Sequence, residues 1–445
     1  MAQIHPVLDD VLPSLRQRLG AIESRPLKGR VVKIIGTVIH AMVPEVRLGE
    51  TCRLRDPYTR QELLAEVVGL TGEVALLTPI GDLRGLSNRT EVEPTGQMLR
   101  IPYGRGLLGR TLDSLGRPLD AQEKGRLEVE GHYSVYQEPP DALSRPVISE
   151  PIHLGVRAID ALLTCGRGQR VGVFGAPGAG KSSLLARIIK HADVDVAVIA
   201  LIGERGREVR EFIDQHLDAK GRDRAVIVVA TSDRPAMERV KAAYTATAVA
   251  ERFRDQGRHV LLLMDNLTRF SRALREIGLA AGEPPTRRGF PPSVFADLPR
   301  LLERAGTSAR GSITGLYSVL VEGDIMADPI AEETRSILDG HIVLSSELAE
   351  RGHFPAIDVL ASRSRLMDMV TGKAQRDHAA HLRELMARYA SIELLLQVGE
   401  YQKGTDALAD EAIDKKERIT AFLRQGPEDL ADQAETIRQL EQLAK

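Results

Sequence analysis

The sequence has little of several residue types that mark specialised classes of protein. It contains no tryptophan, and aromatic residues make up only 4% of its 445 positions. Cys52 and Cys165 are its only cysteines, and two thiols so far apart form neither a metal-binding motif nor a disulfide framework. We therefore expect two reduced thiols in the cytoplasm rather than a secreted, disulfide-bonded scaffold.

Long apolar runs and a strong charge of one sign are also missing. No run approaches the ~20 apolar residues that cross a bilayer, and the N-terminus lacks the basic and apolar regions of a signal peptide. The net charge is −2, so no overall positive field draws the chain to nucleic acid or anionic lipid. With 43% hydrophobic and 27% charged residues, the composition is typical of a globular protein with two or three domains.

Residues 1–29 form a segment with helical spacing. Five of its apolar residues fall on one face of a helix: Leu8, Val11, Leu12, Leu15 and Leu19. We expect this face to pack on its own domain, because the segment has few basic residues. Contact with a membrane, with a neighbouring subunit or with another partner is the alternative.

Residues 30–101 predict a small β-barrel domain. β-rich runs such as Val31–Ile39, Leu63–Val68 and Val74–Leu77 alternate with glycine-containing turns, as in small barrels and sandwiches. At the other end, residues 367–445 are rich in Ala, Leu, Glu, Gln, Arg and Lys with helical spacing. We therefore expect a helical domain at the C-terminus.

Residues 102–366 predict an α/β domain with a parallel sheet. Its apolar runs are nearly unbroken, which fits strands that are covered on both faces, and helical segments lie between them. These runs are Val171–Phe174, Val196–Ile202, Ala225–Ala230 and Val260–Met264, with Ile313–Leu320 and His341–Leu344 as later members of the same sheet.

The segment Gly175–Ser182 carries the strongest functional signal. It reads Gly-Ala-Pro-Gly-Ala-Gly-Lys-Ser and matches the phosphate-binding pattern G-x-x-x-x-G-K-[ST], between a predicted strand and a predicted helix. Its glycines let backbone N–H groups surround an anion, and the helix N-terminus adds partial positive charge. Lys181 is expected to contact the β- and γ-phosphates of ATP, and Ser182 to bind Mg²⁺. The residues predicted to bind ATP here are Gly175, Ala176, Pro177, Gly178, Ala179, Gly180, Lys181, Ser182 and Ser183.

Two further strand ends supply candidates for hydrolysis. The apolar run before Asp265 ends in an acid, as a Walker B element requires, so Asp265 is expected to orient Mg²⁺. After another apolar run, Glu204 is the candidate for polarising the attacking water. Arg205 is expected to meet phosphate oxygens, with Glu208 behind it. From spacing alone, a solvated charged loop explains this segment equally well.

With these residues in view, the chain resembles the P-loop ATPases related to the subunits of rotary ATP synthases. It is especially similar to the ATPases of type III secretion and of flagellar export. The resemblance runs over roughly residues 30–425 and rests on many segments. They are Gly109–Asp113, Gly155–Asp160, Gly166–Ser183, Leu201–Phe212, Leu263–Phe270, Pro291–Gly306, Gly311–Asp324, Asp328–Leu344, His353–Arg365 and Gly399–Gln402.

The resemblance implies a RecA-like P-loop core between the barrel and the helical domain, and it assigns roles to single residues. The family's phosphate, Mg²⁺ and water-activating positions match Lys181, Ser182, Glu204, Arg205 and Asp265. Arg269 matches an arginine near the site in the family's D-x-x-x-R segment.

Two positions further along the chain also match. Arg365, the last residue of Ala361–Arg365, matches the arginine finger that reaches into a neighbouring subunit's site. Arg363 stands where the family has a small or apolar residue, which leaves open which of the two arginines acts in trans. Phe354 matches an aromatic residue beside adenine, and a core phenylalanine is the alternative.

The function that the resemblance implies is a homohexameric ATPase that hydrolyses Mg·ATP to energise type III protein secretion. It would release and unfold chaperone-bound cargo for the export gate. Further implied partners are stator and central-stalk proteins, and the implied location is the cytoplasmic face of the inner membrane, with peripheral attachment. The resemblance is closer to injectisome than to flagellar ATPases in two C-terminal segments, Thr405–Lys416 and Phe422–Gln425.

Three other functions are alternatives. A flagellar export ATPase would have the same chemistry, and a rotary ion-pumping ATPase would need a second, alternating subunit type. A nucleic-acid translocase is disfavoured, because sequence-tolerant strand binding uses aromatic stacking platforms and residues 1–100 contain one aromatic residue, Tyr58. We therefore expect no nucleic-acid partner.

Overall fold

The computed structural model describes residues 28–321, 328–426, 429 and 431–445. The helical face predicted within residues 1–29 lies outside these residues. The chain divides into two compact units, residues 1–98 and 99–445. None of the helices in the described part combines the length and the hydrophobicity that a membrane span requires.

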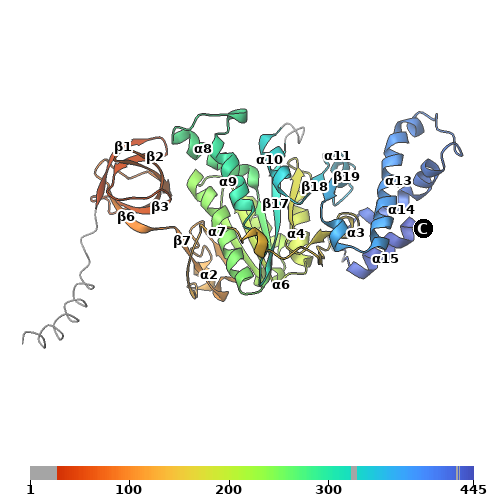
Figure 1. Ribbon diagram of the computed structural model, residues 1–445, viewed down its shortest axis with the longest axis horizontal. Coiled ribbons are helices and arrows are strands. Elements are labelled where there is room, and N and C mark those ends of the chain that lie inside the picture. Colours follow the sequence, from red (N-terminus) through yellow and green to blue (C-terminus); the bar gives the residue numbers. More distant parts are fainter. Residues whose placement is uncertain (1–27, 322–327, 427–428, 430) are drawn as a thin grey trace, which may run out of the picture. The chain divides into compact units, whose positions relative to one another are not determined.

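The first unit is a closed β-barrel, as predicted (Figure 1). Its strands pair antiparallel in the order β1-β2-β5-β4-β3-β6. They are β1 (Gly29–Ile35), β2 (Val38–Met42), β3 (Glu50–Arg55), β4 (Glu62–Thr71), β5 (Val74–Ile80) and β6 (Glu91–Met98). The run Val31–Ile39, predicted as one β-rich run, is split between β1 and β2, because Gly36 turns the chain with a φ of 55°.

The second unit is built on a nine-stranded sheet. The strand order is β19-β18-β12-β17-β15-β13-β14-β8, with β16 paired to β17. Pairing is parallel from β18 to β8, whereas β19 and β16 each pair antiparallel. The strands are β8 (Thr111–Leu112), β12 (Arg170–Gly175), β13 (Val196–Ile202), β14 (Ala225–Ala230), β15 (His259–Asp265), β16 (Gly306–Thr307), β17 (Ser312–Leu320), β18 (Gly340–Leu344) and β19 (Ile357–Ser364).

Helices cover both faces of this sheet, which explains the unbroken apolar runs. Every residue of β13 and β14 is buried, as expected for strands between two helical layers. Figure 1 shows α7 and α8 on one side of the sheet and α4 on the other. The helices of this part are α2 (Ala121–Lys124), α3 (Arg157–Leu162), α4 (Lys181–His191), α5 (Gly206–Glu211), α6 (Ala219–Asp223), α7 (Ala236–Asp255), α8 (Leu267–Ala280), α9 (Pro292–Leu302), α10 (Pro329–Ile337), α11 (Ser346–Glu350) and α12 (Met367–Val370).

The C-terminal part is helical, as predicted. It consists of α13 (Lys373–Gln397), α14 (Ala407–Leu423) and α15 (Gln433–Ala444), all of which contact α3. Apolar residues of these helices, among them Leu382 and Leu440, belong to the same buried cluster as the sheet. The predicted fold class is thus confirmed, while the domain boundaries at residues 29, 101 and 366 stay predictions.

A buried ion pair in the second unit connects α7, the segment after α9 and the segment that contains Val135. Arg304, which follows α9, donates from Nε and Nη2 to the carboxylate oxygens of Glu251 on α7, over 2.8 and 2.6 Å. The two side chains are 2% and 0% exposed. Arg304 Nη1 also donates to the Val135 carbonyl at 2.8 Å. Because both carboxylate oxygens are satisfied, the two charges are compensated inside the protein.

We predict that Arg304→Met lowers the free energy of unfolding by about 3–5 kcal/mol, because it leaves the Glu251 carboxylate buried and unpaired. The double variant Arg304→Met/Glu251→Leu should recover most of this loss, since it buries no charge. Urea denaturation followed by circular dichroism measures both. Arg351→Ala, which breaks an exposed pair with Glu347, is the control and should leave the midpoint unchanged. Equal stability of the single variant and the wild type would contradict this account of the pair.

Candidate functional site

The loop between β12 and α4 borders a cavity at the carboxyl edge of the sheet. β12 ends at Gly175 and α4 begins at Lys181. Gly178 and Gly180 adopt φ angles of 86° and 80°, a left-handed conformation that a side chain would strain. The cavity has a volume of about 550 Å³ and is also lined by residues that follow β13 and β15. Ionisable side chains of both signs line it: Lys181, Arg205, Arg269, Glu204, Glu208, Glu211 and Asp265.

The predicted Mg²⁺ positions lie at this cavity beside the P-loop lysine. Asp265 is the last residue of β15, and its Oδ1 lies 3.2 Å from Lys181 Nζ. Ser318 on the adjacent β17 donates its hydroxyl to the same carboxylate oxygen. Ser182 lines the cavity as well. Among the described residues, no three His, Cys, Asp or Glu side chains are grouped to hold a metal ion.

Glu204 is held at the cavity by residues from α8 and the turn before it. Asn266 Nδ2 donates to Glu204 Oε1 at 2.9 Å, and Arg269 Nη2 lies 3.4 Å from Oε2. The Glu204 side chain is only 14% exposed. Burial, and then the nearby Asp265 charge, raises its pKa to about 7. Glu204 is therefore a largely buried carboxylate at the site rather than part of a solvated loop, with a pKa suited to handling a proton near neutral pH.

Arg205 differs from Glu204 although the two are neighbours in sequence. Its side chain is 74% exposed, and its Nη1 lies 3.5 Å from Glu208 Oε1. Both residues line the cavity. The geometry thus leaves Arg205 room to turn toward a bound anion, which is a change of rotamer rather than of backbone.

Phe354 lies at a second cavity that adjoins the P-loop. This cavity has a volume of about 630 Å³, and it shares Gly180 and Ser183 with the first. The Phe354 side chain is 46% exposed, so it is not a core residue. The segment after α14 contributes to the cavity wall, because Gln425 lines it and donates its backbone N–H to the Phe354 carbonyl at 2.8 Å. A partly apolar cavity beside a phosphate loop, with an exposed aromatic ring, has the character of a base-binding site.

Arg363 and Arg365 lie away from the cavity of their own chain. Both are exposed, and neither lines either cavity. Arg365 directly follows β19, the edge strand of the sheet. Its Nη2 donates to the Arg335 carbonyl at 3.2 Å, and its backbone N–H donates to the Asp339 carbonyl at 2.9 Å.

Three residues that hold site residues or line a cavity were missed in the sequence: Asn266 bonds Glu204, Ser318 bonds Asp265, and Gln425 lines the second cavity. Asn266 had a local signal, because an asparagine directly before a helical run is a preferred N-cap, and its Oδ1 does accept the N–H of Arg269. Ser318 lies within an apolar strand, and Gln425 follows a distant helix. Nothing in their local sequence indicates that they reach the site.

Three family models match the chain. Residues 31–96 match the beta-barrel domain of the ATP synthase alpha/beta family, and residues 155–364 match its nucleotide-binding domain. Residues 371–442 match the T3SS EscN ATPase C-terminal domain. The first two matches include the barrel and the strands around the cavity, and the third includes the C-terminal helices.

Individual proteins are similar over nearly the whole chain. A type 3 secretion system ATPase of Sinorhizobium fredii is 55% identical over 97% of this chain and 95% of its own length. The SPI-2 type 3 secretion system ATPase of Salmonella typhimurium is 50% identical, over 93% of this chain and 94% of its own. A flagellum-specific ATP synthase of Bacillus subtilis is 47% identical over the same two shares, 93% and 94%.

Solved structures agree with these relatives. The assembled ATPase EscN of the enteropathogenic E. coli type III secretion system has a TM-score of 0.89 and 47% identity, covering 94% of this chain and 100% of that chain. EscN in complex with its central stalk EscO has a TM-score of 0.87 and 46% identity, with the same coverage. The predicted family is confirmed: this chain belongs to the type 3 secretion system ATPases, whose barrel and nucleotide-binding domains are those of the ATP synthase alpha/beta family.

Proposed function

We propose that this chain hydrolyses ATP at the cavity beside the P-loop to energise protein export by a type 3 secretion system. One observation carries the proposal: Lys181, Ser182, Glu204 and Asp265, from three separate segments, border a single cavity. A phosphate loop, a metal-orienting acid and a buried carboxylate are the parts that P-loop hydrolysis requires. The names of the relatives supply the biological setting.

Each group has a physical task in this proposal. The backbone N–H groups of the loop and the N-terminus of α4 hold the phosphates, and Lys181 turns from Asp265 to the β- and γ-phosphates. Ser182 and Asp265 are the residues that would hold Mg²⁺, because a hydroxyl and one carboxylate leave the remaining positions to phosphate and water oxygens. When bound, Mg²⁺ would supply positive charge where the phosphate oxygens gather negative charge.

Glu204 is the group proposed to orient the attacking water. Its carboxylate is fixed by Asn266 and Arg269 within the cavity. A fixed acceptor can align a water for attack and take up its proton, which contributes about 10²–10⁴ in rate for a well-placed general base.

The charges at the cavity support a site shared between subunits. Its three basic side chains each face a carboxylate of the same chain: Lys181 faces Asp265, Arg269 faces Glu204 and Arg205 faces Glu208. Four acidic residues line the cavity against these three cations. A triphosphate therefore needs positive charge from outside the chain, which Mg²⁺ and an arginine from a neighbour would supply.

Arg365 is the arginine proposed to act in trans within a homohexamer. It is exposed at the end of an edge strand and does not line its own cavity. An arginine finger supplied in trans is worth about 10³–10⁵ in turnover in other P-loop enzymes. The solved relative described as an assembled ATPase supports assembly of this chain.

The proposed partners follow from the same relatives. The EscN complex with the central stalk EscO supports a stalk protein as a partner of this chain. Stator proteins, an export gate and chaperone–cargo complexes complete the proposal, with the ring held peripherally at the cytoplasmic face of the inner membrane. The match of residues 371–442 to the EscN C-terminal domain favours an injectisome. The flagellar relative at 47% identity keeps flagellar export as the second candidate.

For Glu204→Gln, we predict retained ATP binding and a turnover lower by about 10²–10⁴, because the amide cannot take the proton of the attacking water. Nucleotide titration and phosphate release measure the two properties separately. Glu238→Gln is the matched control, since Glu238 is another partly buried glutamate with a raised pKa and lies outside the cavity. Full turnover in Glu204→Gln would place the water-orienting role on another residue.

For Arg365→Ala, we predict a loss of about 10³–10⁵ in turnover that mixing can partly restore. Lys181→Ala subunits lack a working phosphate loop but carry an intact Arg365. In mixed rings they can complete the site of an Arg365→Ala subunit, so the mixture should hydrolyse ATP although neither variant alone does. Confirmed mixed assembly without any recovery would contradict action in trans.

The export role is tested in a strain from which the gene for this chain is deleted. The wild-type chain should restore secretion of type 3 substrates, and the Lys181→Ala chain, produced at the same level, should not. The chain should also fail to restore motility to a strain that lacks its flagellar ATPase. Rescue of motility without rescue of secretion would favour the flagellar alternative.

A further inference from the structure

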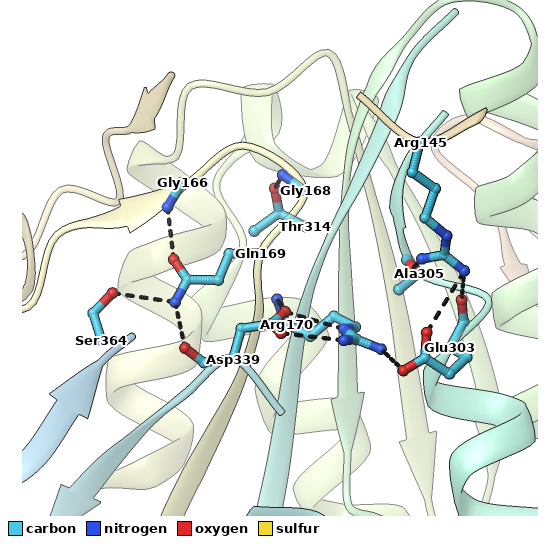
Figure 2. Close-up of polar contacts among 10 residues, drawn as sticks. All are labelled: Arg145, Gly166, Gly168, Gln169, Arg170, Glu303, Ala305, Thr314, Asp339 and Ser364. Carbon is cyan, nitrogen blue, oxygen red and sulfur yellow. Dashed lines mark hydrogen bonds and ion pairs between the residues drawn. The ribbon is translucent and has the colours of Figure 1, made fainter. Parts of the chain in front are cut away.

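A set of polar contacts joins the start of β12 to Asp339 and to Ser364, the residue before Arg365 (Figure 2). The side chain of Gln169, which directly precedes β12, is completely buried. Its Nε2 donates to the Asp339 carbonyl at 3.0 Å and to the Ser364 hydroxyl at 3.1 Å, while its Oε1 accepts the Gly166 N–H at 2.8 Å. The amide of one side chain thus joins the end of β19 to the start of the P-loop strand.

Asp339 is fixed on both its backbone and its side chain by Arg170. Its carboxylate accepts hydrogen bonds from the Arg170 backbone N–H, Nε and Nη2, each at 3.1 Å, and its own N–H donates to the Arg170 carbonyl at 2.9 Å. The Asp339 carbonyl, held in this way, accepts the N–H of Arg365 at 2.9 Å. The backbone of Arg365 is therefore attached through Asp339 to the first residue of β12.

The packing around these contacts leaves little freedom. The Ser364 hydroxyl donates to the Thr164 carbonyl at 2.8 Å. A β-carbon on Gly340 would lie 2.7 Å from the Arg363 carbonyl, so β18 and β19 approach closely beside Arg365. The backbone at Arg365 is held by Asp339, and the preceding Ser364 is held by Gln169 and Thr164. The Arg365 side chain is exposed and bonds only the Arg335 carbonyl among the described residues.

We propose that Gln169, Arg170 and Asp339 are positioning residues that set where Arg365 reaches the neighbouring subunit's site. The proposal rests on the action of Arg365 in trans. A long, exposed arginine can contact a phosphate reproducibly only if its backbone is fixed, and a misplacement of ~1 Å can cost 10²-fold in rate. β12 leads directly into the P-loop, and its first residue, Arg170, holds Asp339, which bonds the backbone of Arg365. One strand therefore connects a subunit's own phosphate loop to the arginine that would enter the neighbouring subunit's site.

Mixed rings test whether the cluster acts on the subunit's own site or on the neighbour's. Gln169→Met removes the donor to Asp339 and Ser364, and we expect turnover to fall up to about 10²-fold with unchanged ATP affinity. Mixed with Lys181→Ala, which supplies a correctly placed arginine, Gln169→Met should recover activity. Mixed with Arg365→Ala, it should not, because every arginine in that ring is misplaced or absent.

The opposite pattern overturns the proposal. If the cluster served only the subunit's own phosphate loop, Gln169→Met would recover with Arg365→Ala and not with Lys181→Ala. Unchanged turnover, recovery with both partners or recovery with neither would also overturn it. If Arg365→Ala itself fails to recover with Lys181→Ala, action in trans fails, which is a separate result.

Two further variants distinguish a misplaced arginine from a general loss of folding. Ser364→Ala removes the hydroxyl that joins Gln169 to the end of β19, is a smaller change, and should show the same mixing pattern with a weaker loss. Thr314→Val removes the hydroxyl that accepts the Gly168 N–H at 2.9 Å, a buried bond at the same end of the sheet that does not touch Asp339. It should keep the turnover of assembled rings, and a loss like that of Gln169→Met would show that any damage here has the same effect.

Discussion

The parallel pairing of buried strands brings the candidate catalytic groups to one edge of one sheet. Leu201 on β13 lies beside Asp265 on β15, and Gly175 at the end of β12 lies beside Leu320 on β17. Since the carboxyl ends of parallel strands meet at the same edge, the phosphate loop, Asp265 and the turn after β13 must converge. A slip of β15 by one residue would turn the Asp265 side chain to the opposite face of the sheet. The register of these parallel strands is therefore a condition for the chemistry.

The sequence predicted the parts of this site that depend on local patterns. The phosphate loop has fixed spacing, and Asp265 follows an apolar run whose length and lack of alternation indicate a parallel strand. The environment of Glu204 was not predictable in the same way. Its pKa is raised by burial and by Asp265, which is far away in sequence, and its orientation depends on Asn266 and Arg269. Such effects arise only when the strands are assembled side by side.

The less predictable features join distant segments of the chain. Ser318 reaches the Asp265 carboxylate from an adjacent strand, and Gln425 reaches Phe354 from beyond α14. The Asp339 carbonyl binds Arg365 from the turn before β18. The hydrophobic periodicity of the sequence does not predict these contacts. They depend on the order of the strands and on how α13, α14 and α15 pack against the α/β core. The paired charges of the cavity likewise emerge only from the assembled fold, and they support the proposal that a neighbouring subunit completes the site.

The most direct test of this account is a structure of the assembled ring with Mg²⁺ and a non-hydrolysable ATP analogue. The account predicts that the phosphates lie against the backbone N–H groups of residues 178–182, with Lys181 released from Asp265. It also predicts that Arg365 of the partner subunit contacts the γ-phosphate. Phosphates bound elsewhere, or a γ-phosphate surrounded only by groups of its own chain, would contradict the claim that this sheet edge is one half of a shared ATPase site.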